Sequence, residues 1–182
     1  MSIFPTKILL ATDESEEAEL GLLTAVDLAN RTDSELHVVY VAGPGPEATL
    51  NPTFALNREL WEETLREIER EAREVLDGQV KKTEEAGGTV AQAYLRIAQA
   101  HLRTGGRPDR EIVELAEEIG TGLIAMGSRG LGGIRRALVG SISDSVLRHA
   151  HCPVLVVRTE KGSRSLEGSV SAARRSRREA EG

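Results

Sequence analysis

The chain has 182 residues, of which 40% are hydrophobic and 29% charged, with a formal net charge of −6. This length and composition suit one soluble domain with a sizeable core, and the acidic balance argues against non-specific nucleic-acid binding. No run of about 18 apolar residues suggests a membrane span, and the N-terminus lacks a signal-type pattern. With Cys152 as the only cysteine, we expect a cytoplasmic protein.

Four short runs are apolar throughout instead of alternating with polar residues, at 7–12, 35–42, 123–126 and 153–158. This pattern is typical of strands that are buried on both faces of a parallel sheet. Helical spacing of apolar residues predicts helices at 15–31, 54–86, 109–119 and 141–150. Strands alternating with helices predict an α/β protein with a single open parallel sheet.

Polar residues at the predicted helix starts suggest how these helices are capped. Ser15 is expected to cap the first helix and Asp109 the third. Ser141 and Asp144 have the spacing of a capping box for the last helix.

Residues 91–97 read AQAYLRI, and residues 98–104 repeat them almost unchanged as AQAHLRT. Because seven is odd, one continuous strand would turn the two copies to opposite faces of the sheet. We therefore expect only one copy to lie in the sheet, and favour the one that contains His101. Deletion of 91–97 is then expected to leave folding and ligand binding intact.

The last segment differs from the rest in composition. Residues 161–182 are rich in Ser, Arg and Glu, carry more basic than acidic residues, and have few large apolar side chains. This composition predicts a disordered basic tail after a single domain at 1–160.

Glycines crowd the segment that follows the 123–126 run. The motif GxxxxGK[ST] does not occur there. The motif GxGxxG also fails, because position 135 is arginine where the pattern needs glycine. What remains is Gly127-x2-Gly130-x9-Gly140-Ser141, with its first glycine at a strand end and its last at a helix start. A phosphate chain fits such a segment; the alternative is a structural glycine turn followed by an ordinary helix cap.

The same spacing resembles the ATP-binding branch of the universal stress protein family, which is marked by G-x2-G-x9-G-[ST]. The resemblance covers roughly residues 3–158, through KILLATDES, ELHVVYVA, LIAMGSRGLGG and HCPVLVVR. It implies a five-stranded parallel sheet in the order 3-2-1-4-5 with helices on both faces. The ligand would lie between the carboxyl ends of the first and fourth strands.

The resemblance also implies a set of residues that bind ATP, with Mg²⁺ held through the phosphates. Asp13 would face the ribose and adenosine, backbone groups at Val41 would read the adenine edge, and Met126 and Gly127 would pass beside the nucleoside. The phosphates would be surrounded by Arg129, Gly130, Gly140, Ser141, Ile142 and Ser143.

Two positions depart from the family pattern, and one has a second interpretation. Ala11 belongs to the expected site but stands where many members have proline, and Thr121-Gly122 replaces a frequent acidic residue before the fourth strand. Asp13, as an acidic residue at a strand end, could also be the N-cap of the next helix.

The implied function is that of an ATP-binding regulatory homodimer in the stress response. The expected interface is the apolar last strand, which would lie at a sheet edge and comprises Val154, Leu155, Val156 and Val157. Two alternatives remain: a slow ATPase or autophosphorylating enzyme with Ser141 or Ser143 near the γ-phosphate, and a structural dimer without nucleotide.

The sequence gives no basis for assigning a catalytic residue or a metal site. It contains no P-loop lysine, paired acidic metal ligands or placed general base. His149, His151 and Cys152 lie close together but lack the further ligands that a metal site requires. We therefore expect nucleotide binding without rapid hydrolysis.

Overall fold

The computed structural model describes residues 3–44, 57–98, 107–128 and 140–158. In these ranges strands and helices alternate along the chain, in the order β1 (Lys7–Thr12), α1 (Glu16–Thr32), β2 (Glu35–Ala42), α4 (Arg58–Glu85), β3 (Val90–Ile97), α5 (Pro108–Glu118), β4 (Leu123–Gly127), α6 (Ser141–His149) and β5 (Val154–Val157). The predicted tail at 161–182 lies outside the described residues. None of the described helices has the length and apolar composition needed to cross a membrane.

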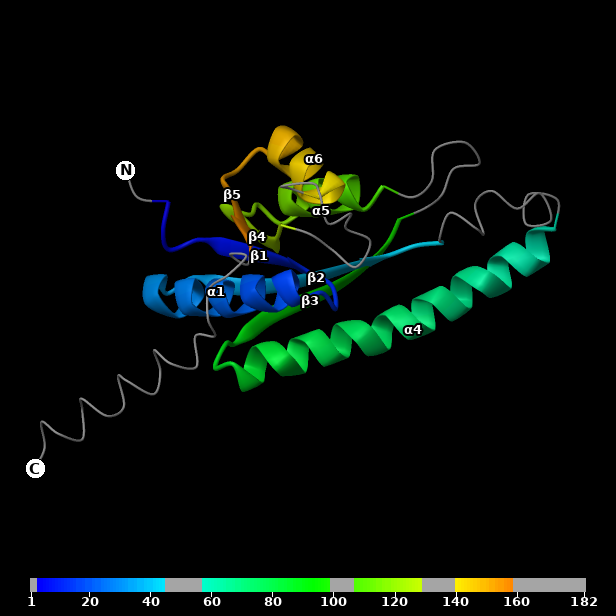
Figure 1. Ribbon diagram of the computed structural model, residues 1–182, viewed down its shortest axis with the longest axis horizontal. Helices are drawn as coiled ribbons and strands as arrows, with labels where there is room; N and C mark the ends of the chain where they lie inside the picture. Colours follow the sequence, from blue (N-terminus) through cyan, green and yellow to red (C-terminus); the bar gives the residue numbers. More distant parts are fainter. Residues whose placement is uncertain (1–2, 45–56, 99–106, 129–139, 159–182) are drawn as a thin grey trace, which may run out of the picture.

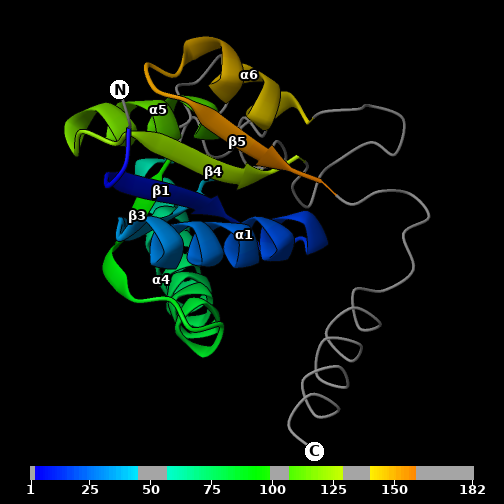
Figure 2. The same ribbon diagram turned by 90° about the vertical axis from the view of Figure 1, so that its left-hand side faces the viewer.

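The five strands form one parallel sheet in the order β3-β2-β1-β4-β5. Helices α1 and α4 cover one face, and α5 and α6 cover the other (Figures 1 and 2). The predicted fold class and strand order are therefore confirmed. The central strand β1 pairs with β2 along its whole length and with β4 from Ile8↔Leu123 to Ala11↔Met126.

Each face of the sheet has its own hydrophobic core. Successive side chains in a strand point to opposite faces, so Ile8 and Leu10 pack under α1 and α4 while Leu9 and Ala11 pack under α5 and α6. Both faces are covered, which explains why the strand segments are apolar throughout. By the same alternation, successive polar residues near the strand ends face opposite helix layers.

The cap prediction for α1 is confirmed, whereas that for α5 is wrong. Ser15 is the N-cap of α1, and its Oγ accepts a hydrogen bond from the N–H of Ala18 at 3.2 Å. Helix α5 begins at Pro108, one residue earlier than predicted, so Asp109 lies inside the first turn. Its carboxylate interacts with Arg107 and with α6 instead of capping its own helix.

The capping box predicted for α6 does not form. Gly140 is the N-cap, no side chain makes a cap hydrogen bond, and Ser141 is already helical. The carboxylate of Asp144 pairs with Arg148 one turn further along, at 2.6 Å. The first turn of α6 is therefore left without a side-chain cap.

The duplicated heptad enters the sheet through its first copy, so the prediction that favoured the copy with His101 is wrong. Strand β3 includes residues 91–97, while 99–104 lie outside the described residues. Tyr94 gives a physical reason: its ring stacks on buried His37 with centroids 5.9 Å apart, and its hydroxyl lies 3.3 Å from His37 Nδ1. Deletion of 91–97 would put His101 in the place of Tyr94, so we no longer expect that deletion to be silent.

Candidate functional site

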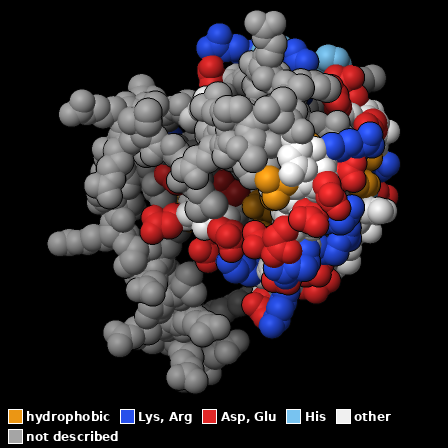
Figure 3. Space-filling view, turned by 90° about the vertical axis from the view of Figure 1, so that its right-hand side faces the viewer, with side chains coloured by type: hydrophobic (Ala, Val, Ile, Leu, Met, Phe, Trp, Pro, Cys, Tyr) orange, Lys and Arg blue, Asp and Glu red, His pale blue; other side chains and the backbone are white. Residues whose placement is uncertain are grey.

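The crevice at the carboxyl ends of β1 and β4 is the point where the strand order reverses. From β1 the chain adds β2 and β3 on one side of the sheet, and later β4 and β5 on the other. In open α/β sheets, ligands bind outside the strand ends at such a switch point. These ends point to the right in Figure 1, and Figure 3 views the molecule from that side, with many Asp and Glu side chains among Lys and Arg.

Asp13 lies at this edge, directly after β1, and its carboxylate organises the turn into α1. Its Oδ1 accepts hydrogen bonds from the N–H of Ser15, at 2.9 Å, and from the Ser15 hydroxyl. Ser15, in turn, caps α1. The cap interpretation of Asp13 is therefore wrong in its simple form, because Asp13 orients the capping residue instead of capping the helix itself.

The β1 and β2 side of the crevice is acidic. The pKa of Tyr40, near the end of β2, is raised above its ordinary value of 10.0, first by burial and then by the negative charges of Glu14 and Asp13. Helix α1 adds Glu16, Glu17 and Glu19 in its first turn. This part of the crevice therefore disfavours further negative charge.

Gly127, the first glycine of the motif, lets helix α1 lie directly against β4. A Cβ at this position would lie 2.7 Å from the carbonyl carbon of Glu17 and 2.8 Å from the nitrogen of Ala18. From the opposite side, a Cβ on Gly21 would come within 3.2 Å of the Gly127 nitrogen. Packing between α1 and β4 thus accounts for this glycine.

Main-chain hydrogen bonds hold the start of α6 at the end of β4. The Gly140 N–H donates to the carbonyl of Ser128 at 2.7 Å, and the Ser128 N–H donates to that of Val157 at 2.6 Å. The Ser143 hydroxyl donates to the carbonyls of Ser128 and Gly140, at 2.9 and 3.0 Å. Arg129 and Gly130, which were also predicted to contact phosphate, lie outside the described residues.

The two helices that begin at the crevice differ in what they offer an anion. Helix α1 has a serine cap and three acidic residues in its first turn. Helix α6 has a glycine N-cap, no side-chain cap and a single acidic residue in its first turn, Asp144, which pairs with Arg148. The first N–H groups of an α-helix have no intrahelical acceptor and carry the positive end of the helix dipole. Ser141 and Ile142 are exposed in this turn, while the hydroxyl-bearing Ser143 is 3% exposed. An anion is therefore best accommodated at α6.

The remaining predicted site residues differ in what they present to the crevice. β2 pairs with β1 only as far as Tyr40, so Val41 extends past the end of its neighbour on that side. Ala11 and Met126 are buried in the core under α5 and α6. The structure thus brings Asp13 and Val41 to the same edge as Gly127 and residues 140–143.

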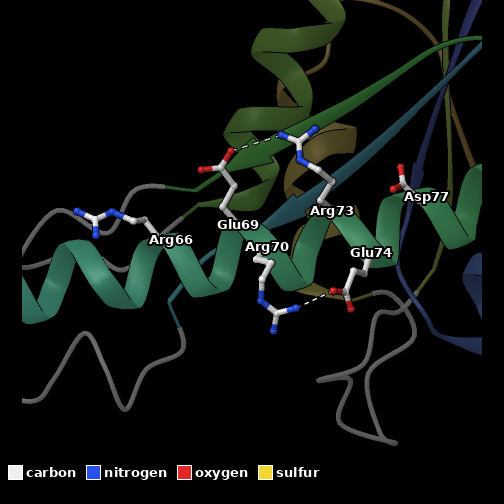
Figure 4. Close-up of a pocket in the computed structure, with 6 residues that line it drawn as sticks. All are labelled: Arg66, Glu69, Arg70, Arg73, Glu74 and Asp77. Carbon is white, nitrogen blue, oxygen red and sulfur yellow. Dashed lines mark hydrogen bonds and ion pairs between the residues drawn. The ribbon is translucent and has the colours of Figure 1, made fainter.

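A shallow groove along α4 lies on the exposed surface of that single helix (Figure 4). Its charged side chains pair along the helix, as Arg70 does with Glu74 at 2.6 Å and Arg73 with Glu69 at 3.4 Å. The groove is lined by Arg66, Glu69, Arg70, Arg73, Glu74 and Asp77. These residues form the solvated face of an amphipathic helix. Within the described part of the chain, no group of three or more His, Cys, Asp or Glu is placed to hold a metal ion.

The strand order and the crevice at its reversal define an open, doubly wound α/β protein. Residues 5–158 match the family described as the universal stress protein family, and the chain belongs to that family. It is 33% identical to a universal stress protein of Methanocaldococcus jannaschii over 155 residues, covering 85% of this chain and 83% of the relative. It is 35% identical to a putative universal stress protein of Staphylococcus haemolyticus, covering 85% of each chain.

Solved structures share this fold. The structure of hypothetical protein MJ0577 matches with a TM-score of 0.67 and 26% identity, covering 88% of this chain and all of the other. A universal stress protein in complex with cAMP shares the fold at a TM-score of 0.60 and 22% identity, over 87% of this chain and 100% of the other. The Archaeoglobus fulgidus universal stress protein in complex with dAMP shares it at 0.53 and 22%, over 86% and 99%.

Proposed function

We propose that this chain is a regulatory protein that binds ATP, or another adenine nucleotide, in the crevice between β1 and β4. The observation that carries the proposal is the uncapped first turn of α6, which hydrogen bonds from Gly140 and Ser143 to Ser128 hold at the end of β4. Family membership supports it, as do the two relatives of the same fold described in complex with cAMP and dAMP. Both of those ligands combine an adenine base with a phosphate.

The charges of the crevice suggest how the nucleotide would lie. The phosphates would be placed at the N–H groups of Ser141 and Ile142, since the acidic turn at Asp13 and the first turn of α1 would repel them. The nucleoside would then lie toward Asp13 and the main chain of Val41. Any Mg²⁺ would be bound mainly by phosphate oxygens, as is usual for this ion.

We favour a cytoplasmic homodimer that takes part in the stress response and binds ATP without hydrolysing it rapidly. The hydroxyl of Ser143 is buried and donates to main-chain carbonyls, which does not suit a phosphate acceptor. Ser141 is exposed and would contact phosphate through its N–H and hydroxyl.

The proposal is tested by titration calorimetry with Mg·ATP on the wild type and on a Ser141→Asp variant. A carboxylate in the first turn of α6 would repel the phosphates, so affinity should fall by about tenfold or more, equivalent to about 1.4 kcal/mol. The matched control is Leu147→Asp, which adds the same charge at the exposed far end of the same helix. Absence of binding by the wild type at millimolar nucleotide, or equal weakening in both variants, would refute the proposed site.

A further inference from the structure

Gln79 is a buried amide in the middle of an otherwise mostly apolar contact between α4 and the sheet. It is 4% exposed and continues the inward-facing stripe of Ala72, Leu76 and Thr83. Burying an amide costs free energy unless its polar atoms find hydrogen-bond partners. The side-chain amide of Gln79 therefore needs a hydrogen-bond partner within this contact.

The contact is the last residue of β1. The hydroxyl of Thr12, which is 7% exposed, donates to Gln79 Oε1 at 3.1 Å across a separation of 67 residues in sequence. Its Oγ1 also lies 3.2 Å from the carbonyl oxygen of Asp13, so one hydroxyl proton faces two acceptors. Gln79 thus contacts the strand end immediately before the acidic residue of the crevice.

The main chain from Thr12 to Asp13, followed by hydrogen bonds, connects this contact to the start of α1. Thr12 is followed by Asp13, whose Oδ1 accepts from the N–H of Ser15 at 2.9 Å, and Ser15 caps α1 through Ala18. A change in the direction of the chain at Thr12 would therefore be transmitted to the Asp13 carboxylate.

The sheet itself gives limited support to this strand end. Pairing between β1 and β4 stops at Ala11↔Met126, and pairing with β2 stops at Thr12↔Tyr40. Beyond these pairs, the hydrogen bonds from Thr12 and Ser15 to Asp13 contribute to the course of the chain. The hydrogen bond that Thr12 donates to Gln79 ties this strand end to α4.

We propose that Gln79 is a positioning residue for the nucleotide crevice, which acts through Thr12 to hold the turn at Asp13 in its binding geometry. The inference rests on the proposed function, and it predicts that a residue on α4, outside the crevice, controls nucleotide affinity.

The test compares Gln79→Met and Thr12→Val, which remove the hydrogen bond with little change in size, with the double variant and Thr12→Ser. Titration with Mg·ATP should show affinity weakened about three- to thirty-fold in each single variant, with no further loss in the double variant because both act on one bond. Thr12→Ser keeps the hydroxyl and should bind close to wild type.

A second readout does not depend on nucleotide. Hydrogen exchange of the Ser15 amide, followed by NMR, should become faster in Gln79→Met and Thr12→Val, since that N–H is donated to Asp13. Thr83→Val is the matched control, because Thr83 is buried one turn further along α4 and its hydroxyl bonds only to the Gln79 carbonyl among the described residues. This control should lower thermal stability without changing nucleotide affinity or Ser15 exchange.

The possible outcomes separate the inference from the function on which it rests. If wild type binds ATP but neither bond-removing variant changes affinity or Ser15 exchange, the role of Gln79 is refuted and the proposed function stands. If wild type binds no adenine nucleotide, the proposed function fails and so does the claim that Gln79 controls affinity. If Thr83→Val matches the other variants in both readouts, the effect is general destabilisation and the inference is wrong.

Discussion

Gly122 lies against Thr6 at the entry to β4, where a side chain has no room. A Cβ at this position would lie 1.9 Å from Thr6 Oγ1 and 2.9 Å from Thr6 Cβ, and the Thr6 N–H is itself bonded to Ser34 Oγ at 3.0 Å. Replacing Gly122 with alanine should therefore cost about 1–3 kcal/mol of unfolding free energy, measured by urea denaturation.

Gly78 provides the control for that substitution. It lies in α4, and a Cβ built on it meets nothing within 4 Å. Gly78→Ala should stabilise the protein by about 0.5–1 kcal/mol, because alanine loses less backbone entropy in a helix. If both alanine variants were stabilising, the contact with Thr6 would not be the reason for Gly122.

Helices α5 and α6 are joined by the carboxylate of Asp109, which sets the position of the proposed anion-binding helix. Asp109 Oδ2 accepts from Arg107 at 2.5 Å and from the Ser145 hydroxyl at 2.6 Å. Burial alone would raise the pKa of Asp109, but the hydrogen bonds from Arg107 and Ser145 and the charge of Arg107 outweigh it and hold the pKa below its ordinary value of 3.8.

This lowered pKa predicts the pH dependence of a variant. The unfolded chain binds a proton on Asp109 more readily than the folded protein, so the stabilisation is present above 3.8 and is lost as pH falls below it. Asp109→Asn should lower the free energy of unfolding by about 1–3 kcal/mol at neutral pH, and by less as the pH falls below 3.8. Urea denaturation at neutral pH and at a pH below 3.8 measures this difference. The control is Asp144→Asn, which removes an exposed ion pair with Arg148 and should change stability little.

Among the described strands, β5 lies at one edge of the sheet. All four of its residues are half-buried, and only β4 pairs with it among the described strands. An apolar edge of this kind favours pairing with a second copy. We therefore predict a homodimer through β5, with Val157→Lys shifting the protein toward monomer by light scattering at micromolar concentration.

A control distinguishes the strand from apolar surface in general. Leu23, on α1, is 49% exposed, and Leu23→Lys should leave the mass of the assembly unchanged. A wild-type monomer at micromolar concentration would contradict the prediction, as would a dimer that Val157→Lys does not weaken.

Local patterns predicted four of the five described strands and the four described helices, whereas β3 was not among the predicted apolar runs. Continuous apolar runs such as 7–12 predicted buried parallel strands because both faces of the sheet are covered. Helical spacing of apolar residues predicted a helix at 15–31, and the buried side of α1 includes Ala18, Leu22 and Val26. The family resemblance implied a crevice between the ends of the first and fourth strands, and the structure places Asp13 directly after β1 and Gly127 at the end of β4. The roles of Arg129 and Gly130 stay predictions.

The errors arose where two parts of the chain compete for the same hydrogen bonds or space. Asp109 has the composition of a cap, but Arg107 and Ser145 bind its carboxylate. The heptad copies differ at two positions, and contact with His37 on a neighbouring strand favours Tyr94.

The sequence by itself determined the α/β class, which follows from the periodicity of apolar residues. Its resemblance to a known family gave the strand order and the edge at which a ligand is expected to bind. Only the tertiary structure decided that α1 packs on Gly127, that α6 lacks a side-chain cap, and that Gln79 is bonded to the end of β1. Those facts depend on side chains from distant segments meeting in space, and no local pattern encodes such a meeting.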